Sequence, residues 1–296
     1  MSISCPYCKS QNPSSQSRAL IVAAGYFIRR SDNTREQRFS CKPCKRTFST
    51  ATPKVCYRQR KRHINPLIYG TMASGISQRR LAFLLKINRK TVIRRLLFLG
   101  ITSDGVSKQL RSEYPLATDV QFDELETFEH SKLKPLSVIT AVETETRRIL
   151  GFRVARMPAK GLLAKKSVKK YGKRIDERQK CRRQLFEEIK PFLTDNCILR
   201  SDENPHYKND VKKFFPNSEH KTYLGRQGCV VGQGELKAGG FDPLFSLNHT
   251  YAMKRANVNR LFRRTWNTTK KPERLALHLA VYTLYHNEFL IWNKAR

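Results

Sequence analysis

The segment Val120-Gln-Phe-Asp-Glu-Leu125 alternates apolar and polar side chains and begins the largest sheet that the sequence predicts. Alternation with a period of two is typical of a strand with one buried face. Two more short strands follow at Leu136–Val142 and Arg148–Val154, and the turn-like Glu143-Thr-Glu-Thr146 separates them. We therefore expect three consecutive antiparallel strands joined by short connections.

Helices and strands alternate after these three strands. Residues 156–183 are rich in Lys and Arg and continue into a helix, and Cys197-Ile-Leu-Arg-Ser201 forms a fourth strand with Asp202 at its end. A helix near His206–Phe215 and a strand near His220–Leu224 follow. The expected order is that of an RNase H-like domain: three antiparallel strands, then helix, strand, helix, strand and helix. We therefore expect an α+β fold.

Two carboxylates stand out by their positions in this order. Asp123 lies midway along the first strand, beside Glu124, and Asp202 lies at the tip of the fourth. These two strands are neighbours in the expected topology, so the carboxylates can meet. Paired carboxylates of this kind bind Mg²⁺, which supports phosphodiester chemistry. A strand Asp is also a common edge or turn residue, and that alternative stays open.

The charge balance points to a polyanionic partner. The 296 residues contain 58 Lys and Arg against 24 Asp and Glu, a formal net charge of +34. Residues 1–112 hold 23 basic and only 3 acidic side chains. Such a charge repels itself unless a polyanion screens it, and nucleic acid is the usual one. A generic basic protein, such as a ribosomal one, is the alternative.

The sequence carries no sign of a membrane or of export. No stretch approaches the roughly 18 apolar residues of a membrane-spanning helix. Met1-Ser-Ile-Ser-Cys5 lacks the charged start and apolar run of a signal peptide. We therefore expect a cytoplasmic, nucleoid-associated protein, in which thiols stay reduced.

Four of the cysteines have the spacing of a zinc site. Cys5-Pro-Tyr-Cys8 and Cys41-Lys-Pro-Cys44 are two C-x2-C pairs separated by 32 residues. Two such pairs complete a tetrahedral four-thiolate site with no open position, which makes the zinc structural and not catalytic. An apolar strand at 19–27 and a turn at 31–34 predict a β-hairpin zinc ribbon over residues 1–56. Cys56, Cys181, Cys197 and Cys229 lack such spacing and are expected to be ordinary cysteines.

Residues 57–112 have the pattern of a helix-turn-helix. Ser77 is an N-cap candidate for a helix that buries Leu81, Leu84 and Leu85. A break at Ile87-Asn88 precedes a basic helix over Arg89–Leu99, which Gly100 is expected to end, and residues 101–115 are expected to be a linker. A helix near Ile64–Met72 would complete a three-helix unit, and an ordinary helical hairpin is the alternative.

Basic side chains of this unit would contact phosphates and major-groove edges. These DNA-binding candidates are Arg79, Arg80, Arg89, Lys90, Arg94 and Arg95. A second basic group near the C-terminus would line a DNA path, unless it is only a solvated helix face: Arg255, Arg260, Arg263, Arg264, Lys270 and Lys271.

Nearly the whole chain resembles bacterial insertion-sequence transposases of the DDE class that combine a zinc ribbon, a helix-turn-helix and a catalytic domain. The matching motifs are short, and their order carries the specificity. They are Cys5-Pro-Tyr-Cys8, Cys41-Lys-Pro-Cys44, Phe122-Asp-Glu-Leu125, Ile149-Leu-Gly-Phe152, Leu199-Arg-Ser-Asp202 and the segment from Asn248 to Asn259. The resemblance makes Asp123 and Asp202 the first two members of the catalytic triad, and it places the catalytic domain at residues 113–296.

The third member is where this chain departs from the family. The resemblance places it near Tyr251 or Lys254, and neither is a carboxylate. A long Gly-rich loop insertion at 225–246 precedes that helix. Glu235 is the first candidate for the missing ligand, with His249 and Asp242 next; Asn248 is a further substitute, and a degenerate site is the remaining alternative.

The resemblance implies an enzyme that binds the terminal inverted repeats of its element, cleaves DNA with Mg²⁺ or Mn²⁺ and transfers the ends to target DNA. It also implies a homo-oligomer, because two ends must be joined. Two other functions stay open: a non-catalytic DNA-binding regulator or decayed transposase, and a structure-specific nuclease.

Overall fold

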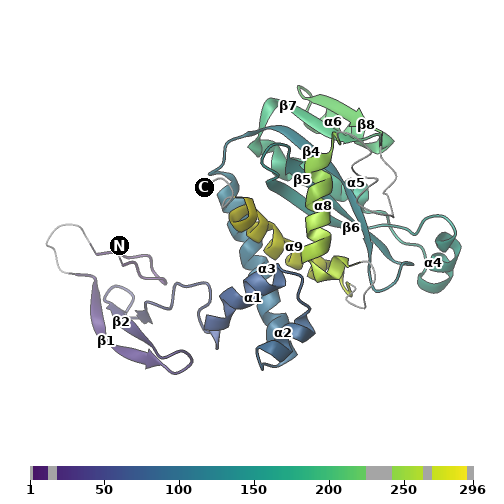
Figure 1. The fold of residues 1–296 in the computed structure, drawn as a ribbon. Coiled ribbons are helices and arrows are strands. Elements are labelled where there is room, and N and C mark those ends of the chain that lie inside the picture. The colour runs from purple at the N-terminus through teal and green to yellow at the C-terminus, as the bar shows by residue number, and fades with distance from the viewer. Residues whose placement is uncertain (1–2, 13–18, 225–241, 263–268, 292–296) are drawn as a thin grey trace. The chain divides into compact units, whose positions relative to one another are not determined.

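The computed structural model describes residues 3–12, 19–224, 242–262 and 269–291 (Figure 1). The chain divides into two compact units, residues 1–66 and 67–296. None of the helices in the described part has the length and hydropathy that a bilayer crossing requires.

The first unit is built on a three-stranded antiparallel sheet. Its strands are β1 (Ile21–Arg29), β2 (Thr34–Cys41) and β3 (Thr47–Ser49), in that order. Arg29 and Arg62 both bind Asp32 and Glu36, and Glu36 is buried. This ion cluster ties the segment around Arg62 to the sheet, so the unit continues past residue 56, where the sequence predicted its end.

The second unit begins with three helices. They are α1 (Asn65–Met72), which starts just before the division, α2 (Gln78–Leu84) and α3 (Arg89–Arg111). The Ser77 hydroxyl accepts a hydrogen bond from the Arg80 amide and caps α2, as predicted, and the Asn88 side chain caps α3 in the same way. These caps satisfy amide groups that a helix start leaves without partners.

Two details of these helices were predicted wrongly. The α3 helix does not end at Gly100 but continues to Arg111, so most of the expected linker 101–115 is helical. A Cβ on Gly100 would lie 2.6 Å from the Leu277 Cβ, so the glycine permits close packing against a later helix instead of ending its own. Leu84 is 56% exposed, because the face that packs on α3 passes through Leu81 and Ala82.

A five-stranded mixed sheet forms the centre of the second unit. Its order is β6 (Ile149–Arg156), β5 (Pro135–Glu143), β4 (Ala117–Phe128), β7 (Leu193–Asp202), β8 (Glu219–Tyr223). The first three strands pair antiparallel, whereas β7 pairs parallel to β4 and to β8. This is the strand order expected of an RNase H-like domain.

Helices cover both faces of the sheet. They are α5 (Arg178–Ile189), α6 (Pro205–Phe214), α8 (Phe245–Asn257) and α9 (Pro272–Tyr285), which is followed by a π-helical turn at His286–Ile291. The helix α4 (Leu163–Tyr171) projects beside the sheet (Figure 1). Alternation along β4 places Phe122 in a core with α5 and α6, and Leu125 in a second core with α8 and α9 (Figure 1).

The helices α1 to α3 share this unit with the sheet, whereas the sequence predicted a separate domain at 57–112 and a boundary before 113. The reason is the long α3, which packs along α9. A hydrogen bond also joins α1 to α9: Nε2 of the buried His278 donates to the Met72 carbonyl at 2.8 Å.

Candidate functional site

Asp123 and Asp202 lie at adjacent positions of neighbouring strands. β4 and β7 run parallel, with Asp119 opposite Ile198 and Gln121 opposite Arg200. Continuing this register by two residues on each strand places Asp123 opposite Asp202. The sequence predicted this juxtaposition, and the strand pairing provides it.

Hydrogen bonds hold both carboxylates in place. The hydroxyl of Tyr207, a buried residue on α6, donates to Oδ1 of Asp123 at 3.0 Å. The Asn204 amide donates to Oδ1 of Asp202 at 3.1 Å. From the other side, the Tyr251 hydroxyl donates to the backbone carbonyl of Asp123. The pair therefore lies where β7, α6 and α8 meet β4.

Other carboxylates along β4 have basic partners. The pairs are Asp119 with Arg200 at 2.6 Å, Glu124 with Arg182 at 3.4 Å, and Glu126 with Lys160 at 2.6 Å. Within the described residues, neither Asp123 nor Asp202 forms an ion pair. In a chain with a net charge of +34, two adjacent carboxylates without a basic partner are the exception.

The environment of Asp123 opposes its negative charge. Burial, and next the nearby Asp202 carboxylate, raise the pKa of Asp123 to about 7. A bound cation would reverse both effects, because it favours the ionised form of each carboxylate. Mg²⁺ and Mn²⁺ prefer oxygen ligands and take few of them from the protein, so the pair fits such an ion.

The α8 helix presents Tyr251 and Lys254 to this part of the sheet, where the resemblance places the third acidic residue. Lys254 is fully buried, and its Nζ donates to Oγ1 of Thr140 at 2.8 Å. Thr140 is the residue opposite Asp123 on β5. Burial lowers the pKa of Lys254 to about 7. A cationic or neutral amine thus occupies the region expected to hold a carboxylate.

The candidates for the third ligand have different surroundings. Asp242 lies just before α8 and accepts hydrogen bonds from the Leu244 amide and the Asn248 side chain, both at 2.9 Å. The His249 ring lies 3.4 Å from Nη1 of Arg147, beyond the end of β5. Glu235 lies outside the described residues. Within them, neither Asp242 nor His249 forms a three-ligand group with the aspartates.

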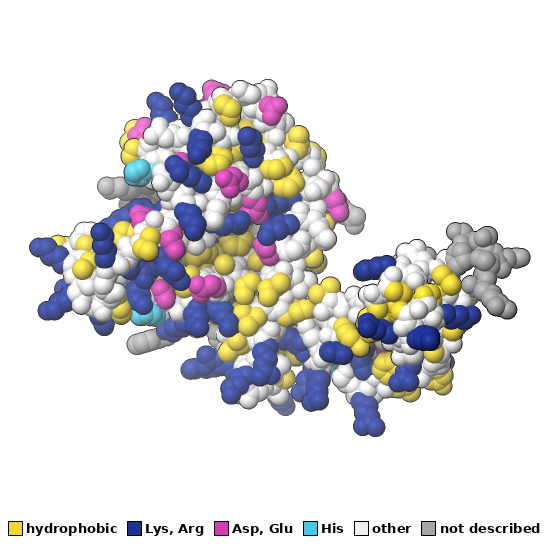
Figure 2. Space-filling view, turned by 180° about the vertical axis from the view of Figure 1, so that it is seen from behind, with side chains coloured by type: hydrophobic (Ala, Val, Ile, Leu, Met, Phe, Trp, Pro, Cys, Tyr) yellow, Lys and Arg dark blue, Asp and Glu magenta, His cyan; other side chains and the backbone are white. Residues whose placement is uncertain are grey.

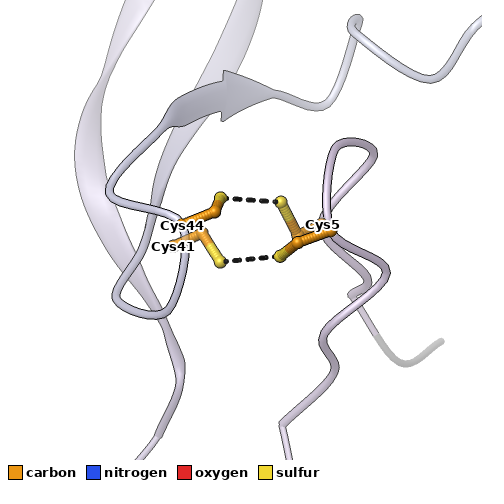
Figure 3. A group of neighbouring side chains, drawn as sticks. Cys5, Cys41 and Cys44 are labelled. Carbon is orange, nitrogen blue, oxygen red and sulfur yellow. Dashed lines mark hydrogen bonds between the residues drawn. The ribbon is translucent and has the colours of Figure 1, made fainter.

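The four predicted cysteines do form one cluster. Their sulfur atoms all lie within 4.8 Å of one another, with Cys5 to Cys44 at 3.7 Å and Cys8 to Cys41 at 3.5 Å (Figure 3). A tetrahedral site with Zn–S bonds of about 2.3 Å needs sulfur separations of about 3.8 Å. The cluster therefore fits zinc.

The basic side chains proposed to bind DNA are mostly on the surface. Arg79, Arg80, Arg89, Lys90 and Arg94 are exposed, whereas Arg95, Arg255 and Arg260 are half-buried. Arg263 and Arg264 lie outside the described residues. Lys and Arg side chains spread over the face shown in Figure 2, with fewer acidic ones among them.

The sequence patterns gave Tyr207 no role, and they marked Tyr251 and Lys254 only as positions where the expected carboxylate is missing. Tyr207 follows Asp202 by five residues, on a helix that Asn204 caps. A polar aromatic residue soon after a strand-end carboxylate was the available signal. For Lys254 the sequence contained no such signal, because burial of a lysine depends on tertiary packing.

No protein-family model matches the chain, and no curated protein matches it. Among solved structures, the catalytic domain of Mos1 mariner transposase aligns with 12% identity and a TM-score of 0.24, covering 64% of this chain and 94% of that one. A complex of the same domain with raltegravir and manganese aligns with 11% identity and a TM-score of 0.24, covering 67% and 95%. TM-scores this low leave the functional argument to the residues of the site.

Proposed function

We propose that this chain is a DDE-class DNA transposase that binds the terminal inverted repeats of its element and catalyses metal-dependent cleavage and strand transfer. One observation carries the proposal: Asp123 and Asp202 lie side by side on β4 and β7 without a basic partner among the described residues. In a strongly cationic chain, such a pair is best explained as a divalent-cation site.

In this proposal Asp123 and Asp202 hold the metal through their carboxylate oxygens. Mg²⁺ or Mn²⁺ bound there would supply Lewis acidity for phosphodiester cleavage and for attack by a 3′-hydroxyl. Tyr207 orients Asp123 through its hydrogen bond at 3.0 Å. The third ligand is proposed to come from Glu235, with Asp242 and His249 as the next candidates.

DNA recognition is assigned to the helix pair and the zinc ribbon. The exposed basic residues at the start of α3, Arg89, Lys90 and Arg94, are proposed to contact phosphates and base edges. The four-cysteine cluster is proposed to hold one structural zinc, which folds the ribbon. An oligomer is proposed because two element ends must be joined.

One observation favours a second function. Within the described residues no third acidic ligand lies with Asp123 and Asp202. The position on α8 where the resemblance places that ligand holds Lys254. A non-catalytic DNA-binding regulator, or a decayed transposase, would have such a site. The same core could also serve a structure-specific nuclease.

The deciding experiment incubates the protein with DNA that carries the element's own ends, with Mg²⁺ or Mn²⁺. Cleavage followed by strand transfer supports the transposase, cleavage alone indicates a nuclease, and binding alone indicates the regulator. Asp123→Asn and Asp202→Asn should abolish cleavage and leave DNA binding intact. Asp104→Asn is the matched control, because Asp104 is an exposed carboxylate paired with Lys108 on α3.

A further inference from the structure

A basic cleft lies between the first turns of α2 and α3 and the start of α9. It has a volume of about 440 Å³, and the short helix η3 (Asn259–Leu261) forms part of its wall. Six basic residues line it: Arg79, Arg89, Arg260, Lys270, Lys271 and Arg274. None of the described lining residues is acidic, and Ile93 and Leu96 are its apolar members.

Tertiary contacts fix the walls of the cleft. The Gly75 amide, just before α2, donates to the Asn257 carbonyl at the end of α8 at 2.7 Å. Gly75 has φ +79°, and a Cβ there would lie 3.0 Å from the Ala256 carbonyl oxygen. The His278 bond to Met72 and the contact of α3 with Leu277 hold the other side. These contacts hold the described walls of the cleft in place.

No acidic side chain lies among the described residues that line the cleft. Glu273 is the acidic residue of the first turn of α9, and it pairs with Arg156 at 3.1 Å instead of entering the cleft. Burial, and next the neighbouring Arg274, lower the pKa of Arg260 to about 10. Like charges held together in this way are stabilised by a multivalent anion.

The start of α9 adds the positive end of a helix dipole to these charges. Lys271 is its N-cap residue; Pro272 has no N–H, and the Arg274 amide donates to the Lys271 carbonyl at 3.0 Å. The positive end of the helix dipole, together with the surrounding cations, is a favourable setting for a phosphate.

We propose that this cleft binds the phosphodiester backbone of DNA and holds one strand between the helix pair α2–α3 and α9, an inference that rests on the proposed function. Six cations around a cleft of this size match the repeated charges of a nucleic-acid strand better than the single charge of a small ligand. The helix pair that would recognise the DNA and the helix that closes the catalytic unit then hold the same strand.

Lysine footprinting on the wild-type protein tests the cleft directly. An amine-reactive reagent is applied with and without duplex DNA, and the labelled lysines are identified by mass spectrometry. Lys271 should become protected by DNA, whereas Lys212 and Lys213, exposed residues on α6 outside the cleft, should stay reactive. Equal labelling of Lys271 with and without bound DNA overturns the proposal, as does protection by polyglutamate but not by DNA.

Salt-dependent binding provides the second measurement. Lys271→Gln and Arg274→Gln should each weaken duplex binding and lower the slope of log affinity against log salt by about 0.9 for one lost phosphate contact. Lys212→Gln should leave the slope unchanged. Unchanged slopes in both cleft variants, with wild-type protein that binds DNA, refute the cleft alone. Wild-type protein that binds no DNA refutes the proposed function as well.

Discussion

Gly100 of α3 lies so close to Leu277 of α9 that a Cβ on the glycine would be 2.6 Å from the Leu277 Cβ and 2.7 Å from its carbonyl oxygen. Real Cβ atoms do not lie this close to a neighbour, so a side chain at position 100 would force a shift of the two helices. The contact joins the helix pair to the helix that covers the sheet, so it holds the second unit together.

Substitution of this glycine should separate α3 from α9. We expect Gly100→Ala to lower the free energy of unfolding by about 1–3 kcal/mol, because the methyl group overpacks a backbone contact. Gly105→Ala is the matched control, since Gly105 lies on the same helix with nothing within 4 Å of its would-be Cβ. That change should stabilise the protein by about 0.5–1 kcal/mol through helix propensity. Denaturant unfolding measures both, and equal effects would contradict the packing argument.

Removal of one zinc ligand should unfold the first unit only. Cys41→Ser leaves three thiolates, so we expect loss of zinc and rapid proteolysis within residues 1–66, while the second unit stays resistant. Metal analysis and limited proteolysis measure these outcomes. Cys56→Ser is the control and should keep its zinc, because Cys56 is not part of the cluster. Freshly purified wild-type protein without zinc would refute the assignment.

The two arginines in the middle of the basic face of α3 should differ. Arg94 is exposed and Arg95 half-buried, so Arg94→Ala should weaken DNA binding without changing the melting temperature, whereas Arg95→Ala should lower both. Loss of a phosphate contact reduces the salt slope by about 0.9, whereas loss of a guanine contact relaxes one base position by about 1–3 kcal/mol. Binding titrations on varied duplexes separate these cases, and unchanged binding in both variants would move the recognition surface elsewhere.

The raised pKa of Asp123 gives a pH dependence with a definite sign. Its folded pKa of about 7 exceeds the ordinary 3.8, so the metal-free protein loses stability as the pH rises through this range. Asp123→Asn removes that loss. The gain in stability of this variant should grow by at most about 1.4 kcal/mol per pH unit between pH 4 and 7 and then level off. Unfolding in a chelator measures it, and a gain independent of pH would exclude a buried, titrating Asp123.

The buried Lys254 should show a pH dependence in a higher range. Its folded pKa of about 7 lies below the ordinary 10.5, so its contribution to stability is lost as the pH falls from 10.5 towards 7. Lys254→Met removes the buried amine. The advantage of this variant should be greatest below pH 7 and shrink by about 1.4 kcal/mol per pH unit up to pH 10. A constant advantage across this range would show that the lysine is not buried.

Short-range signals determined much of this protein from the sequence alone. The period of two predicted β4, the two short strands expected after it match β5 and β6 within a few residues, and Ser77 marked the start of α2. Strand alternation and helix caps depend on neighbouring residues, so the sequence shows them directly. The spacing of two cysteine pairs predicted the four-sulfur cluster for the same reason, since each pair occupies one tight turn. The order of strands and helices was enough to place Asp123 beside Asp202.

Only the tertiary structure decided which distant segments meet. Gly100 continues its helix because Leu277 lies against it, although glycine commonly marks a helix end. Lys254 is buried beside Thr140 because α8 crosses the sheet there, and nothing local distinguishes it from a surface lysine. The cleft joins residues of α2, α3 and α9 that are almost two hundred positions apart. Burial and charge neutralisation depend on every element that surrounds a side chain, so local sequence patterns do not determine them.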